Sequence, residues 1–263
     1  MSKVKTRLYV QDDLRPQTPV LLTKQQCHFL KNVLRLDVGD AVGVFNGKDG
    51  EWHARINQLT KTQAELEPQA LRQEQSNPPF LRLLFAPVKK DALNFLIEKG
   101  TELGVTIFQP VITRYTHVER VRVERLQTNA MEAAEQCGRL EIPTVLPPLA
   151  LNEVLNNLSE EDQFLACLES GEAQPFTALN LHADKSTSIL IGPEGGFSEE
   201  ELASLRNHSS VRSLSLGPRI LRAETAAVSA VAIYQSLFGD WNARPKKTLW
   251  PDSFSLEGIR PST

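Results

Sequence analysis

Long hydrophobic runs are absent from this sequence of 263 residues, of which 41% are hydrophobic and 23% are charged. No apolar stretch approaches the roughly 20 residues that a membrane-spanning helix requires. The first ten residues, MSKVKTRLYV, carry charge but lack the apolar core of a signal peptide. We therefore expect a cytoplasmic protein that folds as one large domain or two small ones.

Cysteine and histidine are scarce and scattered. Cys27, Cys137 and Cys167 are odd in number and far apart, which predicts no disulfide framework and fits a reducing compartment. The five histidines show no HxxxH spacing, and the cysteines form no CxxC pair. We therefore expect no metal site.

An excess of positive charge is also missing, because the net charge is -3. Residues 1–50 contain eight basic and five acidic side chains, a local charge of +3, so the remainder carries -6. A basic end on an acidic body can contact phosphates without strong overall basicity. The alternative is a solvated face with a few extra lysines, and charge alone favours that alternative.

Short β-rich runs and turns make up the N-terminal part. Turn signals such as Gly39-Asp40 and Asn46-Gly47 separate these runs. One amphipathic helix, capped by Thr23, is expected over residues 23–36. Many short strands with one helix indicate a small barrel. The expected strands cover residues 7–10, 19–22, 41–47, 51–60 and 63–69.

The polar stretch RQEQSNPPF, residues 72–80, ends in two prolines and cannot continue a helix or a central strand. It predicts a linker between a first domain, residues 1–73, and a second, residues 74–241. The remaining residues, 242–263, are rich in proline and polar side chains and are expected to form a loosely ordered tail.

Beyond the linker, strands alternate with helices. This order predicts an α/β domain with a parallel sheet covered by helices on both faces. The expected strands cover residues 81–88, 107–113, 164–169, 187–192 and 211–217. The expected helices cover residues 89–105, 124–139, 149–158, 198–208 and 222–240.

The stretch ILIGPEGGFSEEE, residues 189–201, has an apolar run that enters a glycine loop. It matches neither the GxGxxG of dinucleotide-binding folds nor the GK[ST] of phosphate loops. Gly195 and Gly196 permit positive φ and close approach of a ligand. Ser198 and Glu201 form a capping box, and the acids at the helix start repel phosphate. The loop therefore suits an uncharged or cationic group.

A second loop, in LGPRILRAETAAVSA at residues 216–230, repeats this logic. Gly217 and Pro218 turn the chain after a strand, and two arginines and Glu224 precede a small-residue helix suited to close packing, including across a dimer. A buried helix with a basic first turn explains the loop equally well. Two Gly-Pro loops after adjacent strands favour a site, because open α/β sheets bind ligands at the carboxyl ends of strands.

LIGPEGGFSEEE and LGPRILRAETA together resemble the paired signature of the SPOUT class of methyltransferases, specifically the 16S ribosomal RNA uridine-N3 methyltransferase family (RsmE). The blocks HFLKNVLRLDVGD (28–40), EKGTELGV (98–105) and AAEQCGR (133–139) resemble further family segments in the expected order. The resemblance covers nearly the whole chain except the tail.

The resemblance implies a C-terminal trefoil knot, which is an exception to the rule that chains are unknotted. It implies that the knotted loops hold S-adenosylmethionine in a bent conformation. It also implies a homodimer whose sites are completed near the partner chain, and an N-terminal PUA-like barrel that binds RNA. The product would be N3-methyluridine near the decoding centre of the small ribosomal subunit.

S-adenosylmethionine carries a sulfonium cation and a neutral adenine, so a phosphate loop is not needed. The resemblance implies that both loops contribute to the cofactor pocket. For Glu194 the alternative role is to brace its own loop by hydrogen bonding. The implied pocket residues are Leu190, Ile191, Gly192, Pro193, Glu194, Gly196, Leu216, Gly217, Ile220, Leu221, Thr225 and Ala226.

Methylation of uridine N3 requires loss of the N–H proton, so we expect a base or a group that stabilises negative charge. Arg222 can stabilise charge on the uracil carbonyls, and Glu224 can accept the proton or hold Arg222. Glu135, Gln136 and Arg139 can line the base pocket. In-line transfer also gains from positioning alone.

The predicted phosphate contacts are Arg7, Lys31, Arg35 and Lys89. Two other functions compete with uridine methylation. One is a SPOUT enzyme that methylates a ribose 2′-oxygen or another nucleotide. The other is a noncatalytic RNA-binding protein that retains an inactive pocket, and the intact loop signatures argue against it.

Overall fold

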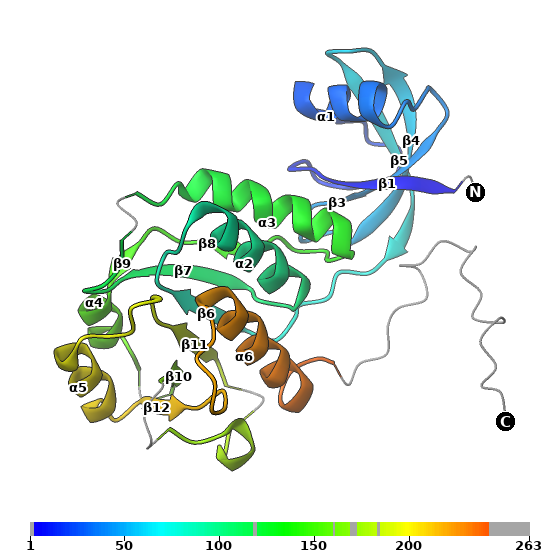
Figure 1. Cartoon of the computed structure of the whole chain (residues 1–263). Coiled ribbons are helices and arrows are strands. Elements are labelled where there is room, and N and C mark those ends of the chain that lie inside the picture. Colours follow the sequence, from blue (N-terminus) through cyan, green and yellow to red (C-terminus); the bar gives the residue numbers. More distant parts are fainter. Residues whose placement is uncertain (1–2, 118–119, 160, 169–172, 183–184, 242–263) are drawn as a thin grey trace, which may run out of the picture. The chain divides into compact units, whose positions relative to one another are not determined.

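The computed structural model describes residues 3–117, 120–159, 161–168, 173–182 and 185–241 (Figure 1). The chain forms two compact units. Among the described residues, the first runs up to Ser76 and includes Gly138–Glu141, and the second contains Asn77–Cys137 and residues 142–241. The break at Ser76 falls inside the predicted linker. The predicted tail, 242–263, lies outside the described residues.

The first unit contains a five-stranded sheet in the order β1-β3-β4-β5-β2. β1 pairs with β3 in parallel, and the other neighbours are antiparallel. The small β-rich domain predicted from the sequence is therefore present, with β1 and β2 at the ends of its hydrogen-bonded path. The strands are β1 (Val4–Tyr9), β2 (Val20–Leu21), β3 (Ala41–Phe45), β4 (Glu51–Leu59) and β5 (Ala64–Gln73).

Helix α1 (Lys24–His28) begins at the predicted cap, where Thr23 Oγ1 accepts a hydrogen bond from the Gln26 N–H at 3.3 Å. The helix does not continue regularly to residue 36. It passes into a π-helical segment, Phe29–Val33, and Arg35 then adopts a φ of 55°. A left-handed backbone conformation ends a right-handed helix. This places Leu30, which is fully buried, in the core of the unit.

The second unit contains a sheet in which every pairing is parallel. Its order is β12-β10-β11-β6-β7-β8, and β9 also pairs with β7. The parallel α/β sheet predicted from the alternation of strands and helices is therefore confirmed. The strands are β6 (Leu81–Phe85), β7 (Ile107–Ile112), β8 (Thr144–Val145), β9 (Leu149–Ala150), β10 (Gln163–Cys167), β11 (Thr187–Ile191) and β12 (Val211–Leu214).

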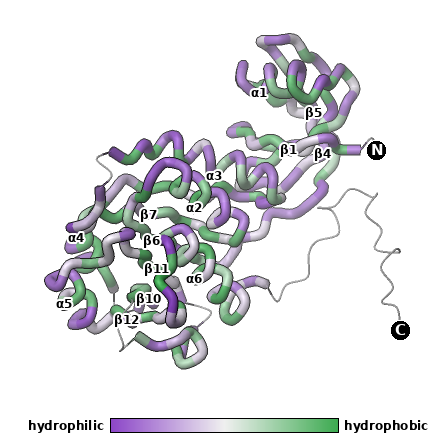
Figure 2. Tube along the Cα trace, in the orientation of Figure 1, coloured by the Kyte–Doolittle hydropathy of each residue, from purple (hydrophilic) through white to green (hydrophobic). Residues whose placement is uncertain are grey.

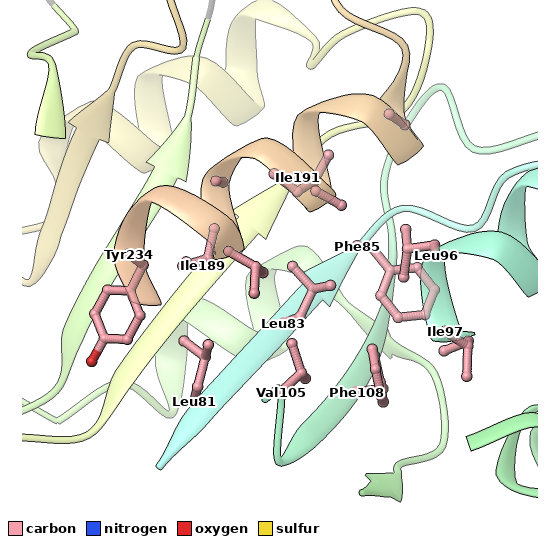
Figure 3. Close-up of a cluster of buried hydrophobic side chains, with 14 of the residues drawn as sticks. Leu81, Leu83, Phe85, Leu96, Ile97, Val105, Phe108, Ile189, Ile191 and Tyr234 are labelled. Carbon is pink, nitrogen blue, oxygen red and sulfur yellow. The ribbon is translucent and has the colours of Figure 1, made fainter. Parts of the chain in front are cut away.

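Helices cover both faces of this sheet, as predicted. α2, α3 and α6 pack on one face, around the alternate residues Leu83 and Phe85 of β6 (Figure 3). α4 and α5 pack on the other face, around Leu84. The apolar strands β6, β10 and β11 lie between these layers (Figure 2). The helices are α2 (Lys90–Glu102), α3 (Val123–Cys137), α4 (Leu151–Asn156), α5 (Glu199–Asn207) and α6 (Ala223–Leu237).

The helix boundaries of the second unit differ from those predicted by one to three residues. Leu149 and Ala150 were expected to begin a helix, but they pair with Val111 and Ile112 of β7 as β9. The helix α4 starts only after this pairing ends. α6 ends at Leu237 rather than at residue 240.

Candidate active site

The carboxyl ends of four neighbouring strands lie in one register row. Leu214 of β12 is paired with Cys167 of β10, Cys167 with Ile191 of β11, and Ile191 with Phe85 of β6. β11 and β12 then lead directly into the two Gly-Pro loops. The parallel sheet thus brings the two sequence motifs together at one edge, where α/β folds bind ligands.

The loop after β11 is built from backbone turns and a capped helix. The Gly196 N–H donates to the Pro193 carbonyl at 2.9 Å, and Gly196 has a φ of 71°, which only glycine adopts without strain. Ser198 Oγ accepts from the Glu201 N–H at 3.3 Å, and Glu201 Oε2 accepts from the Ser198 N–H at 2.9 Å. The predicted capping box is therefore confirmed.

Two details of this loop were not predicted. Glu201 Oε1 also accepts a hydrogen bond from the Arg114 N–H at 2.8 Å, so the capping carboxylate ties the loop after β7 to this one. Gly195 was expected to permit a positive φ, but its backbone does not adopt one. A Cβ there would lie 3.3 Å from Cβ of Tyr115, so this glycine serves close packing instead.

The loop after β12 turns at Gly217, which has a φ of 98° and whose N–H donates to Ser215 Oγ at 3.2 Å. Arg222 is the residue before α6 and is exposed. Ile220 is 85% exposed, the highest value among the large hydrophobic side chains of the described residues.

These loops enclose a cavity of about 860 Å³. Its walls come from the end of β10, the loops after β11 and β12, and the first turn of α6. Within the described part of the chain, Glu194 and Arg219 are the charged residues that line it. A cavity of this size with mainly apolar and backbone walls fits a drug-sized organic cofactor rather than a polyphosphate.

Ten of the twelve predicted cofactor-pocket residues line the cavity. Leu190 is not among them, because it is fully buried on the opposite face of the sheet with Leu84 and Leu205. Thr225 is exposed on α6 and does not line the cavity either. Whether the ten bind a cofactor stays a prediction. They are Ile191, Gly192, Pro193, Glu194, Gly196, Leu216, Gly217, Ile220, Leu221 and Ala226.

Sequence reasoning missed the contribution of a third strand. Cys167 and Leu168 at the end of β10 line the cavity, as do Phe197 and Arg219. The run FLACLE at 164–169 predicted the strand but contains no glycine or charged motif before the cavity residues. Burial raises the pKa of the Cys167 thiol to about 12, so the thiol is protonated at neutral pH and is not a nucleophile there.

Two of the four predicted catalytic residues are neighbours in the structure, and the roles of all four stay predictions. Arg222 and Glu224 lie at the start of α6, beside the cavity. Glu224 Oε2 is buried and has no hydrogen-bond partner among the described residues. Glu135 lies on α3. Both α3 and α6 pack against α2, but Glu135 does not line the cavity. Arg139 belongs to the first unit, where its guanidinium contacts Glu141 at 2.9 Å.

The four predicted RNA contacts differ in their surroundings. Arg7 donates to Glu51 at 2.7 Å and to the Arg139 carbonyl at 2.7 Å, and its guanidinium lies 4.4 Å from the Phe45 ring centre. Its side chain is only 13% exposed, so the geometry favours a structural role. Lys31 forms an ion pair with Asp37 at 2.5 Å. Arg35 and Lys89 are exposed, and their RNA contacts stay predictions.

Residues 75–235 match the family model described as an RNA methyltransferase domain, and residues 22–69 match the model described as an RNA methyltransferase PUA domain. A ribosomal RNA small subunit methyltransferase E of Rickettsia conorii is 34% identical over 86% of this chain and 93% of its own length. The chain belongs to the RNA methyltransferase family. The relative of the same name from Synechocystis is also 34% identical, over 88% of this chain and 77% of its own.

Solved structures of family members agree with this RNA methyltransferase in fold. The ribosomal RNA small subunit methyltransferase E of Neisseria gonorrhoeae, bound to S-adenosyl methionine, has a TM-score of 0.83 at 31% identity. That match covers 90% of this chain and 99% of the other. A methyltransferase of Legionella pneumophila with the same bound cofactor has a TM-score of 0.83 at 28% identity, over 90% of this chain and all of the other.

Two negative findings concern the described residues of this methyltransferase. They contain no group of three or more His, Cys, Asp or Glu side chains arranged to hold a metal ion. Separately, none of their helices has the length and apolar character needed to span a lipid bilayer.

Proposed function

We propose that this methyltransferase transfers a methyl group from S-adenosylmethionine to N3 of a uridine in the 16S ribosomal RNA of the small ribosomal subunit. The observation that carries the proposal is the cavity at the carboxyl ends of β10, β11 and β12, formed by two loops with the family's signature sequences. The Neisseria gonorrhoeae relative, 31% identical, is bound to this cofactor.

The cavity residues fit the cofactor. The cofactor supplies an electrophilic methyl group on a sulfonium, and the rest of the molecule includes an uncharged adenine. Backbone N–H and C=O groups of the loops at 192–196 and 214–221 can bind the edge of a neutral ring, and apolar side chains such as Ile191 and Leu214 can bury it. Glu194, exposed at the cavity, matches the positive charge of a sulfonium.

The start of α6 carries the proposed proton chemistry. Uridine N3 becomes nucleophilic when its proton leaves, and Glu224 is the proposed acceptor. Its Oε2 is buried without a hydrogen-bond partner, a state that costs free energy until a donor arrives. Arg222, exposed at the same helix start, would stabilise the negative charge that develops on the uracil carbonyl oxygens.

We also propose that the enzyme is a cytoplasmic homodimer and that Glu135 and Arg139 act at a partner's site. In support, α6 exposes Ile233 (38%), Leu237 (45%) and, just beyond its end, Trp241 (51%), spaced four residues apart. Such a stripe on one helical face suits packing against a second copy. A trefoil knot of the loops after β11 and β12, and RNA binding by the PUA domain, complete the proposal.

The test is methyl transfer to small subunits that lack the modification. The protein is incubated with these subunits and labelled cofactor, and the product is identified by nucleoside mass spectrometry. We expect N3-methyluridine at one position. A 2′-O-methyl product would replace the N3 assignment with the ribose alternative. Cofactor binding without transfer to any RNA would support the noncatalytic alternative.

A further inference from the structure

A second cavity lies on the methyltransferase unit, with a volume of about 360 Å³. Its lining is polar and includes two arginines, Arg206 from the last turn of α5 and Arg212 from β12, together with Gln174, Asn180 and Ser213. No acidic side chain lines it within the part of the chain that is described. Two guanidinium groups in one concave site without a carboxylate favour an anionic ligand.

Neither guanidinium is neutralised by a described carboxylate. Among the described residues, no carboxylate lies within 4.0 Å of Arg206 or Arg212. Arg212 Nη1 donates to the Asn180 carbonyl at 2.6 Å, which orients the guanidinium and leaves its other N–H groups available. Arg206 is exposed and is held by no hydrogen bond of the described part. One arginine is thus fixed by the fold and the other can adjust to a ligand.

The second cavity adjoins the proposed cofactor cavity. Ser213 lines the second cavity and Leu214 the first, while on the neighbouring segment Gln174 lines the second and Ala173 the first. Backbone hydrogen bonds from the Gln174 N–H to the Ser213 carbonyl (3.0 Å) and from the Ser215 N–H to the Gln174 carbonyl (2.8 Å) form their shared wall. At about 3.3 Å per strand residue, Arg212 lies roughly 10 Å along the chain from Ser215.

The charge of the surrounding sequence supports the same ligand. Residues 202–222 contain four arginines and no aspartate or glutamate, in a chain whose net charge is -3. Two of these arginines, Arg206 and Arg212, line the second cavity, and Arg219 lines the first. The fourth, Arg222, lies at the start of α6. The basic segment therefore follows the two cavities.

We propose that the Arg206–Arg212 cavity binds a backbone phosphate of the substrate RNA, on a nucleotide that flanks the methylated one. The inference rests on the proposed function and adds to it a phosphate contact on the catalytic unit. Contacts of this kind set the register of the RNA on the protein, while the target base is selected elsewhere. The cavity thus positions the target nucleotide at the proposed active site.

The experiment measures steady-state methyl transfer to unmodified small subunits as a function of salt, for the full chain. The variants are Arg206→Ala, Arg212→Ala and the double variant. We expect the double variant to raise KM for the subunits about tenfold or more, as for loss of charged hydrogen bonds. For this variant the slope of log KM against log salt concentration should be shallower by about 1, and kcat should stay within about twofold of the wild-type value. The affinity for S-adenosylmethionine should be unchanged.

Two controls separate a phosphate contact from a structural role. Lys99→Gln also removes one positive charge, but Lys99 lies between Glu98 (2.7 Å) and Glu102 (2.8 Å), so we expect no change in KM. Arg206→Ala breaks no side-chain hydrogen bond of the described residues, so loss of such a bond does not explain its effect. Arg212→Lys should restore part of the salt dependence because it restores the charge.

Three outcomes would overturn the inference. The first is a double variant with the KM and salt dependence of the wild type. The second is loss of thermal stability and cofactor affinity together with KM. The third combines two results: inorganic phosphate stabilises the wild type but not the double variant, and the double variant has an unchanged KM for the subunits. That outcome would assign the cavity to a free anion. If the wild-type protein methylates no RNA, the proposed function itself is refuted. The wild type alone gives that result, so it is distinguishable from failure of the phosphate inference.

Discussion

The two units treat positive charge differently. Seven basic side chains of the first unit form ion pairs with carboxylates, whereas among the described residues of the second unit only Lys99 does so. The first unit is the one with the basic N-terminal sequence. The second contains the arginines beside the cavities, which have no carboxylate within 4.0 Å among the described residues and are called unpaired below. A local count of charges therefore overstates the charge available to RNA in the first unit. The seven are Lys5, Arg7, Arg15, Lys31, Lys48, Arg72 and Arg139.

The largest expected effect concerns an unpaired arginine of the second unit. Arg222→Ala should lower kcat for methyl transfer by about 10²–10³, as for loss of one group that stabilises developing charge. The affinity for S-adenosylmethionine, measured by calorimetry, should be retained. Loss of both methyl transfer and cofactor binding would place Arg222 in the cofactor pocket instead. Arg222→Lys serves as the control that keeps the charge and loses the planar fork.

A paired arginine of the first unit should behave in the opposite way. Arg7→Met leaves the carboxylate of Glu51, which is 3% exposed, in an ion pair with Arg72 but without its ion pair with Arg7. Loss of one partner of a buried pair is destabilising, and we expect about 2 kcal/mol because Arg72 remains. The midpoint of urea unfolding reports this. KM for the ribosomal substrate should stay within about twofold, and a tenfold rise would return Arg7 to the RNA contacts.

Backbone conformation, rather than charge, shapes the second unit's cavity loops. Gly196 and Gly217 have positive φ, and a Cβ at either would meet no atom within 4 Å. Alanine at each position should therefore cost about 1 kcal/mol through backbone strain alone. Thermal unfolding measures the loss of stability, and cofactor titration measures any change in the pocket. Alanine variants at both positions that are as stable as the wild type would contradict the strain argument.

The smallest effect concerns carboxylates of the first unit. The N–H of Leu14 and the side chain of Asn46 donate to Asp49 and lower the pKa of its carboxyl. A lowered folded-state pKa contributes stability above the unfolded value of about 3.9, and this contribution is lost as pH falls through the folded value. Asp49→Asn should therefore destabilise the unit by less than about 1 kcal/mol at pH 7, and this loss should shrink as pH falls below about 3.9.

Trp52 provides a local probe for this measurement, since its Nε1 donates to the Asp49 carbonyl at 2.9 Å. Its fluorescence during urea unfolding can be followed in a background in which the other two tryptophans, Trp241 and Trp250, are replaced by phenylalanine. The free energies of unfolding of Asp49→Asn and the wild type are compared at pH 7 and at pH 2. The same difference at both pH values would refute the electrostatic explanation.

Much of the fold was predictable because its patterns are local. The continuous apolar run of β6 and the periodicity of α2 report burial on the faces that the core occupies. The N-cap at Thr23 and the capping box at Ser198 were predictable because all partners lie within four residues. Boundaries that depend on distant pairing, such as β9 with β7, left no local signal in the sequence.

The candidate site was predictable in part. The two Gly-Pro loops were found from their residues, but Cys167 and Leu168 were not, because an apolar strand end looks the same whether it meets a cavity or a core. Leu190 was misplaced for the reason that successive strand residues point to opposite faces. The Arg206–Arg212 cavity needed the tertiary structure, since a helix end and a strand contribute one arginine each.

The sequence by itself determined the order of strands and helices, the two glycine loops and their caps, and the resemblance that named a family. These depend on contacts between residues that are near in the chain. The tertiary structure decided which strand ends share an edge, which cations are neutralised and which remain available. Those properties depend on the register of β6, β10, β11 and β12 and on distances between distant side chains, and neither is encoded in any single local pattern.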